Sequence, residues 1–140
     1  MNLMILLFTS LLAGLQLYGI RQLGLAKDFL TSGIFRVGEE EMHASSVVAY
    51  TRVYLIFLFL VHLVVWLLGF VHIHPILGAF GCALAFCDFV LNHEVITHLA
   101  NEPFSSKAAD RLMAFGLMLA ILQVACCFLM MGLVIIREVG

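Results

Sequence analysis

Residues 53–71 read VYLIFLFLVHLVVWLLGFV, a run in which His62 is the one strongly polar side chain. An α-helix needs about 20 consecutive apolar residues to cross the roughly 30 Å of hydrocarbon in a bilayer. This stretch meets that requirement, and it contains no Lys, Arg, Asp or Glu. It therefore predicts a membrane-spanning helix with one ionisable group near its middle.

The composition of the whole chain agrees with this prediction. Of its 140 residues, 64% are apolar and 11% are charged, and the mean hydropathy is +1.12. Such values lie outside the usual range of soluble globular proteins. The formal charge of −2 leaves no basic excess to neutralise phosphates, so a nucleic-acid partner is not expected. Membrane lipids and other integral membrane subunits are the partners that we expect.

Three further apolar runs predict three further spans, which begin near residues 2, 76 and 112. The predicted fold is an all-α integral membrane protein with four transmembrane helices in an antiparallel bundle and a short interfacial helix after the first. The chain is expected to form one membrane domain, residues 1–140. We place the spans at about 2–20, 48–73, 76–99 and 107–137, with an interfacial and cytoplasmic segment at 21–45.

The segment after the first span contains two expected helix starts. Residues 22–30 surround one small polar patch with apolar residues, which predicts a short helix lying in the membrane interface. A second start is predicted after Gly38, because the glutamates at 39–41 would meet the positive end of a helix dipole. No proline follows before Pro75, so this helix is expected to run over about 39–73.

Basic residues are distributed unevenly along the chain. With four spans, six of the seven Lys and Arg residues fall on the face that carries segments 21–52 and 92–111, and Arg137 alone lies on the other. Because Lys and Arg near span ends stay on the cytoplasmic side, we expect these segments in the cytoplasm. Both termini are then extracytoplasmic, in a bacterial inner membrane or the equivalent membrane of an organelle.

The polar residues inside the spans are predicted to lie at one depth. In the hairpin of the second and third spans, residues at equal depth have numbers that sum to about 148, a condition that His62 and Asp88 nearly meet. The corresponding sum for the third and fourth spans, about 207 to 211, brings Gln123 within about one helical turn of Asp88. A carboxyl group at the bilayer centre costs about 2.5 to 3.5 kcal/mol on insertion scales, so Asp88 is expected to face the bundle interior.

This candidate polar layer of His62, Asp88 and Gln123 has two interpretations. Thr9 and Ser10, in the middle of the first span, would complete it. The pair of His62 and Asp88 could transfer protons or contact a polar substrate. It could equally form an interhelical hydrogen bond that fixes the register of the bundle. No catalytic residue is assigned.

The third span begins with a run of small residues, which predicts a close approach by another helix. These residues are Gly78, Ala79, Gly81, Cys82, Ala83 and Ala85.

Histidines and carboxylates near the end of the third helix are weak candidates for metal ligands. Glu94 and His98 are one turn apart and share a face, whereas His93 and His98 diverge by about 140°. The ligand types suit a bundle metal site, but the spacing does not, so no metal is predicted. Haem held by this chain alone is not predicted either, since His62 has no histidine at matched depth on the next helix. Cofactors stay unknown, beyond lipid contacts.

Two classes of function compete. The chain has no phosphate-binding glycine loop and no motif of a soluble hydrolase or metalloprotease. This favours a non-catalytic structural or accessory subunit of a larger membrane complex of the respiratory, photosynthetic or membrane-oxidase type. The alternative is a small membrane enzyme or redox module that acts on a lipophilic substrate or quinone. It would use His62 and Asp88, or the cluster of histidines and glutamates at the cytoplasmic end of the helices, to which His93, Glu94 and His98 belong.

Overall fold

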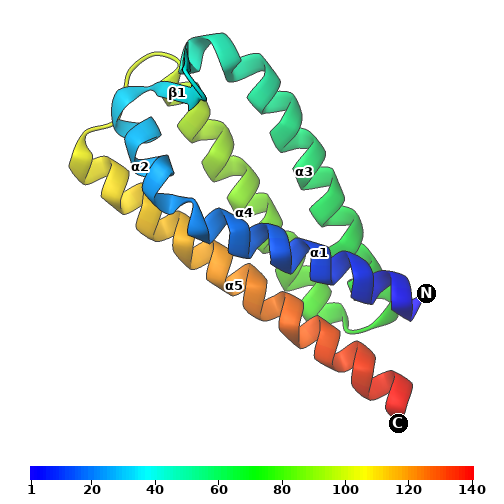
Figure 1. Ribbon diagram of the computed structural model, residues 1–140. Helices are drawn as coiled ribbons and strands as arrows, with labels where there is room; N and C mark the ends of the chain where they lie inside the picture. Colours follow the sequence, from blue (N-terminus) through cyan, green and yellow to red (C-terminus); the bar gives the residue numbers. More distant parts are fainter.

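The computed structural model describes residues 1–140, except for the side chains at 23, 24 and 37. Four of its five helices are long and apolar enough to cross a membrane, as the sequence predicts. The fifth is a short helix directly after the first span, and a β-hairpin follows it (Figure 1). The elements are α1 (Asn2–Arg21), α2 (Leu23–Ser32), β1 (Ile34–Val37), β2 (Glu40–His43), α3 (Ala44–His72), α4 (Pro75–Leu99) and α5 (Ser106–Val139).

The predicted helix over 39–73 is wrong at its start. Its first residues belong to the hairpin, in which β1 pairs antiparallel with β2, and the Arg36 Nε lies 3.0 Å from the Glu41 Oε1. Gly38 has a φ of +64° in the two-residue turn, a conformation that favours glycine. A two-residue loop with glycine first is a strong hairpin signal, and it outweighs the helix-dipole preference of the glutamates. Helix α3 therefore begins at Ala44.

Side-chain caps define where the three later spans begin. The Ser105 hydroxyl accepts a hydrogen bond from the Ala108 backbone N–H at 3.3 Å and so caps α5. Two histidine rings act in the same way at the starts of α3 and α4. They are His43, which accepts from the Ser45 N–H, and His74, which accepts from the Leu77 N–H.

Helices α3 and α4 approach each other closely at the small residues of α4. A Cβ atom added at Gly78 would lie 2.4 Å from the Cα atom of Phe70, and one added at Gly81 would lie 2.1 Å from the Trp66 ring. The residue numbers of both pairs sum to nearly 148. These contacts confirm the close approach and the register that the sequence predicts for this pair of helices.

Helix α1 packs mainly against α5, with which it lies side by side in Figure 1, and α5 also contacts α4. The Asn2 side chain donates a hydrogen bond to the Glu138 carboxylate, and the Ser10 hydroxyl contacts the Met131 sulfur at 3.1 Å. The main buried core lies between α1, α3, α4 and α5. Its large members include Ile5, Trp66, Met130 and Val134.

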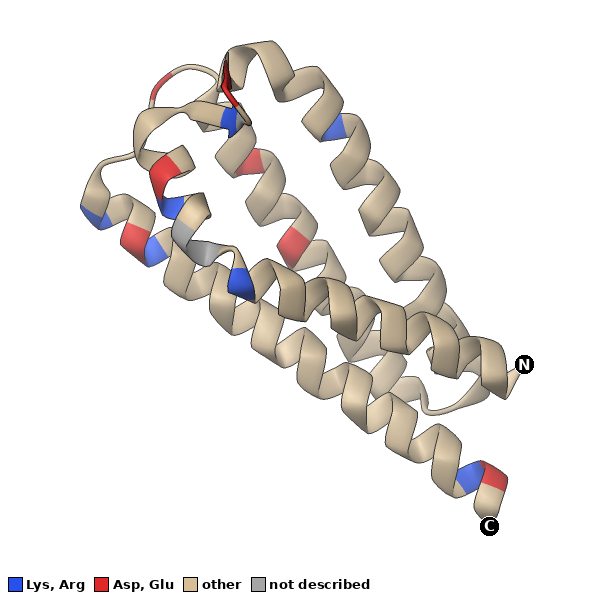
Figure 2. Ribbon diagram, in the orientation of Figure 1, with Lys and Arg blue, Asp and Glu red and all other residues tan. Residues whose placement is uncertain are grey.

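The outer faces of the long helices are apolar, and the charges gather at the ends. Leu3, Val53 and Ile76 are each at least 69% exposed. Figure 2 shows most Lys, Arg, Asp and Glu at the end that carries α2, the hairpin and the start of α5, whereas Arg137 and Glu138 lie near the C-terminus. We call the first of these the charged end.

Candidate functional site: a cavity among the helices

A cavity of about 500 Å³ lies among all five helices, in the half of the molecule nearer the charged end. Its walls are mainly aliphatic and aromatic, and a few polar side chains interrupt them. Such a composition is typical of pockets that bind small lipophilic molecules and orient them with a few polar groups. The polar lining groups inside the walls are Gln16, Thr51, His62, Asp88 and Asn92.

His62 is buried and held in one orientation. Its Nδ1 atom lies 2.7 Å from the backbone carbonyl oxygen of Leu58, which can only accept, so Nδ1 carries the hydrogen. In the neutral ring the Nε2 atom is then an acceptor, and the Gln16 Nε2 atom lies 3.3 Å from it. Gln16 of α1 and His62 of α3 therefore form an interhelical hydrogen bond in which the amide donates.

The same Gln16 amide continues the network to the other two spans. It donates a second hydrogen bond to the Gln123 Oε1 atom on α5. The Gln123 Nε2 atom in turn lies 3.5 Å from the Leu84 carbonyl oxygen on α4, and Gln123 is only 2% exposed. One chain of polar contacts thus connects all four long helices.

Asp88 lines the cavity but does not belong to this network. It is half-buried, and among the described side chains no Lys, Arg or His forms an ion pair with it. No hydrogen bond joins the described side chains of His62 and Asp88. Of the candidate polar layer, the structure therefore links His62 to Gln123 through Gln16, and places His62 and Asp88 on the walls of one cavity.

Gln16 is the site residue that the sequence argument missed. The prediction put Thr9 and Ser10 in the polar layer, but their hydroxyls donate to carbonyl oxygens of their own helix, at Ile5 and Leu6. The sequence offers no corresponding sum for α1 and α5, because no turn joins them; in the structure their paired residues have numbers that sum to about 140. That sum pairs Gln123 with the neighbourhood of Gln16, one and a half to two turns from Thr9 and Ser10.

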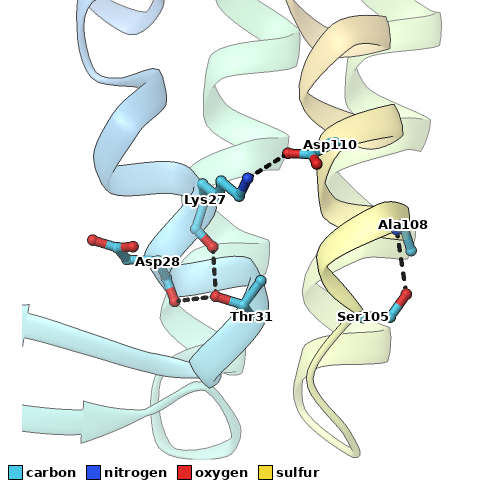
Figure 3. A network of polar contacts seen from close by, with 6 residues as sticks. All are labelled: Lys27, Asp28, Thr31, Ser105, Ala108 and Asp110. Carbon is cyan, nitrogen blue, oxygen red and sulfur yellow. Dashed lines mark hydrogen bonds and ion pairs between the residues drawn. The ribbon is translucent and has the colours of Figure 1, made fainter.

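Helix α2 covers the cavity at the charged end. Ala26, Phe29 and Leu30 line it, and α2 is fastened to the start of α5. The Lys27 ammonium lies 2.7 Å from the Asp110 carboxylate, as Figure 3 shows. The Leu30 carbonyl oxygen also accepts a hydrogen bond from the Phe104 N–H at 2.9 Å. The ion pair is exposed and contributes little to stability. The backbone hydrogen bond therefore fixes the position of α2 more firmly.

The weak metal candidates lie outside the cavity. The His98 Nε2 atom is 3.6 Å from the Glu102 carboxylate, and the His93 Nδ1 atom is 4.0 Å from that of Glu94. Within the described part of the chain, no group of three or more His, Cys, Asp or Glu side chains is placed to hold a metal ion. The expectation that this region binds no metal stays a prediction.

Comparisons with protein-family models, with curated proteins and with solved structures find no match. The function is therefore inferred from the cavity and its polar groups.

Proposed function

We propose that this protein is an integral membrane protein whose four long helices form an antiparallel bundle and bind a lipophilic small molecule in the cavity at the charged end. The cavity carries the proposal. Its volume of about 500 Å³ falls within the range of small-molecule sites, roughly 300 to 1,000 Å³, and its walls are mostly apolar. No chemical step by this chain is required.

The route into the cavity supports a ligand that arrives through the bilayer. The strongly exposed lining residues belong to α1 and α3, two helices that pack mainly against other partners. Tyr18 and Tyr54 are 63% and 57% exposed, and Leu15 is 50% exposed. An opening between these helices would face lipid, so a molecule dissolved in the membrane could enter without crossing water.

The hydrogen bonds of His62 and Gln16 leave neither side chain free to donate to a quinone. A quinone presents two carbonyl oxygens, which are acceptors and need donors from the site. The His62 Nδ1 hydrogen already contacts the Leu58 carbonyl, and both amide hydrogens of Gln16 are engaged. The role as an accessory subunit of a larger complex stays a prediction, and in that case the cavity would hold a lipid or cofactor for the assembly.

Filling the cavity tests the proposal. Gly116 of α5 lines it, and a Cβ atom added there meets nothing within 4 Å, so Gly116→Leu should occupy the space without disturbing the fold. The protein in nanodiscs is labelled with a neutral photoactivatable probe, trifluoromethyl phenyl diazirine, and the labelled residues are mapped by mass spectrometry. We expect saturable labelling of cavity residues, and we expect Gly116→Leu to remove it.

Gly132→Leu is the matched control, because Gly132 lies on the same helix, has equally open surroundings and does not line the cavity. This variant should keep the saturable labelling. Labelling that survives Gly116→Leu unchanged would show that the cavity does not bind the probe.

We propose that the charged end lies in the cytoplasm, because most of the basic residues are gathered there (Figure 2). Single cysteines introduced at Gly38 and Ser105 should react with a membrane-impermeant maleimide only from the cytoplasmic side. A cysteine at His74 should react only from the opposite side. The native cysteines are replaced by Ala first, since Cys87 is exposed on α4. Labelling of position 74 from the cytoplasm alone would reverse the orientation.

A further inference from the structure

From the charges of the cavity, we infer that its ligand is a lipophilic cation, a protonated amine or quaternary ammonium with apolar substituents, whose charge is held by Asp88. This inference rests on the proposed function and adds the chemical class of the ligand. Among the described lining residues, Asp88 is the one acidic side chain, and none is Lys or Arg. Asp88 is therefore the one described lining residue that gives the cavity a negative charge when it is ionised.

A carboxyl group in such a place stays ionised only where its charge is compensated, and it is otherwise protonated. Removing a charged group from water is costly unless an opposite charge or several hydrogen bonds compensate for it. Asp88 is half-buried on α4, a helix long and apolar enough to cross a membrane, and no Lys or Arg among the described side chains pairs with it. A cationic ligand would provide the missing charge, whereas an anionic lipid or carboxylate would meet repulsion.

Two basic residues near the cavity are engaged elsewhere. Lys27 of α2 pairs with Asp110 of α5 (Figure 3), and neither residue lines the cavity. The Arg52 guanidinium donates to the Thr97 hydroxyl at 3.1 Å. No Lys or Arg is among the described residues that line the cavity, and the ring nitrogens of His62, the one basic residue among them, contact the Leu58 carbonyl and the Gln16 amide rather than Asp88.

The polar groups beside Asp88 favour a ligand that donates hydrogen bonds. The Asn92 amide donates to the Asp88 backbone carbonyl at 2.8 Å, and the Thr51 hydroxyl donates to the Val47 carbonyl at 2.9 Å. The Gln16 amide hydrogens contact other side chains, which leaves the oxygen of that amide as an acceptor. A protonated amine could donate to this oxygen and to the Asp88 carboxylate.

Aromatic rings in the walls of the cavity also favour a cationic ligand. The Phe59 ring of α3 lies against the Phe89 ring of α4, with centroids 4.9 Å apart, and both line the cavity. Phe29, Tyr18 and Tyr54 add rings from three helices. The faces of aromatic rings attract cations, and a carboxylate with several rings is a common recognition set for ammonium groups.

Three probes test the inference, two of which are ions of nearly equal shape and opposite charge. Tetraphenylphosphonium is a cation, tetraphenylborate is an anion, and the neutral diazirine reports on the cavity itself. Binding is measured by equilibrium dialysis to nanodiscs of phosphatidylcholine, which carries no net charge, with empty nanodiscs as the blank. We expect saturable binding of tetraphenylphosphonium to the unaltered protein and no saturable binding of tetraphenylborate.

Asp88→Asn keeps the size and the hydrogen-bonding capacity of the side chain and removes its charge, so it should fold and label normally with the diazirine. We expect it to weaken tetraphenylphosphonium binding at least tenfold. Asp28→Asn is the matched control, because Asp28 is exposed on α2 and does not line the cavity. It should change the affinity less than twofold.

The outcomes separate the two proposals. If Asp88→Asn binds the cation as tightly as the unaltered protein does, or if tetraphenylborate binds equally well, the charge inference is wrong. The proposed function then still holds if Gly116→Leu removes the diazirine labelling. Absence of saturable binding for every probe would overturn both.

Discussion

Gly78→Ala should lower the free energy of unfolding by about 1 to 3 kcal/mol, although it adds a single methyl group. The added Cβ atom would lie 2.4 Å from both the backbone N and the Cα atom of Phe70 on α3. Backbone atoms cannot move aside by changing rotamer, so the two helices must separate. The loss of close packing along α3 and α4 should also loosen Trp66, which lies against Gly81 in the same interface.

The measurement uses the single tryptophan of the chain. Unfolding in bicelles with increasing dodecyl sulfate, followed by Trp66 fluorescence, gives the change in stability. Gly132→Ala is the control, because nothing lies within 4 Å of its added Cβ atom. It should raise stability by up to about 1 kcal/mol, the usual gain of Ala over Gly inside a helix. Equal effects of the two substitutions would contradict the close approach of α3 and α4.

Gly69 offers an intermediate case. A Cβ atom there would meet the terminal methyl group of Met130, the flexible end of a side chain, so the neighbour can move. We therefore expect Gly132→Ala to be the most stable of the three variants, Gly69→Ala to be intermediate and Gly78→Ala to be the least stable.

The spans and the register between α3 and α4 could be predicted from the sequence because few physical constraints decide them. Length and hydropathy fix a membrane helix, and a short turn fixes which residues of two helices face each other at equal depth. The pairs of Gly78 with Phe70 and of Gly81 with Trp66 meet that expectation closely.

The hairpin and the role of Gln16 were harder to predict for different reasons. At residues 38–41 two local preferences compete, a glycine turn and an acidic helix start, and the glycine turn prevails. The hairpin is supported by the Phe35 ring, whose centroid lies 5.7 Å from that of Phe29 on α2. Gln16 was overlooked because the first span was centred by its own length, whereas its depth is set by packing against the much longer α5.

Gln123→Met should destabilise the protein by about 1 to 2 kcal/mol, because it removes the amide at the end of the polar network. Gln123 is 2% exposed, so the Gln16 amide hydrogen that it accepts would find no water to replace the lost oxygen. Methionine has nearly the same length and shape, which limits the effect of lost packing. Thr9→Val is the matched control: Thr9 is fully buried, but its hydroxyl contacts only the Ile5 carbonyl of its own helix, which already takes part in the helical ladder.

A double-mutant cycle separates the energy of the hydrogen bond between Gln16 and Gln123 from the effect of burying each side chain. Gln16→Met alone should cost a similar amount, since it leaves both Gln123 and the His62 Nε2 atom without their partner. When Gln16 and Gln123 are both replaced by methionine, no amide between them is left unpaired, so the loss should be smaller than the sum of the single losses. We expect a coupling of at least about 0.6 kcal/mol, the average for interhelical hydrogen bonds in membranes. Strictly additive losses would mean that the two amides do not interact, and that α1 is held against α5 by apolar packing alone.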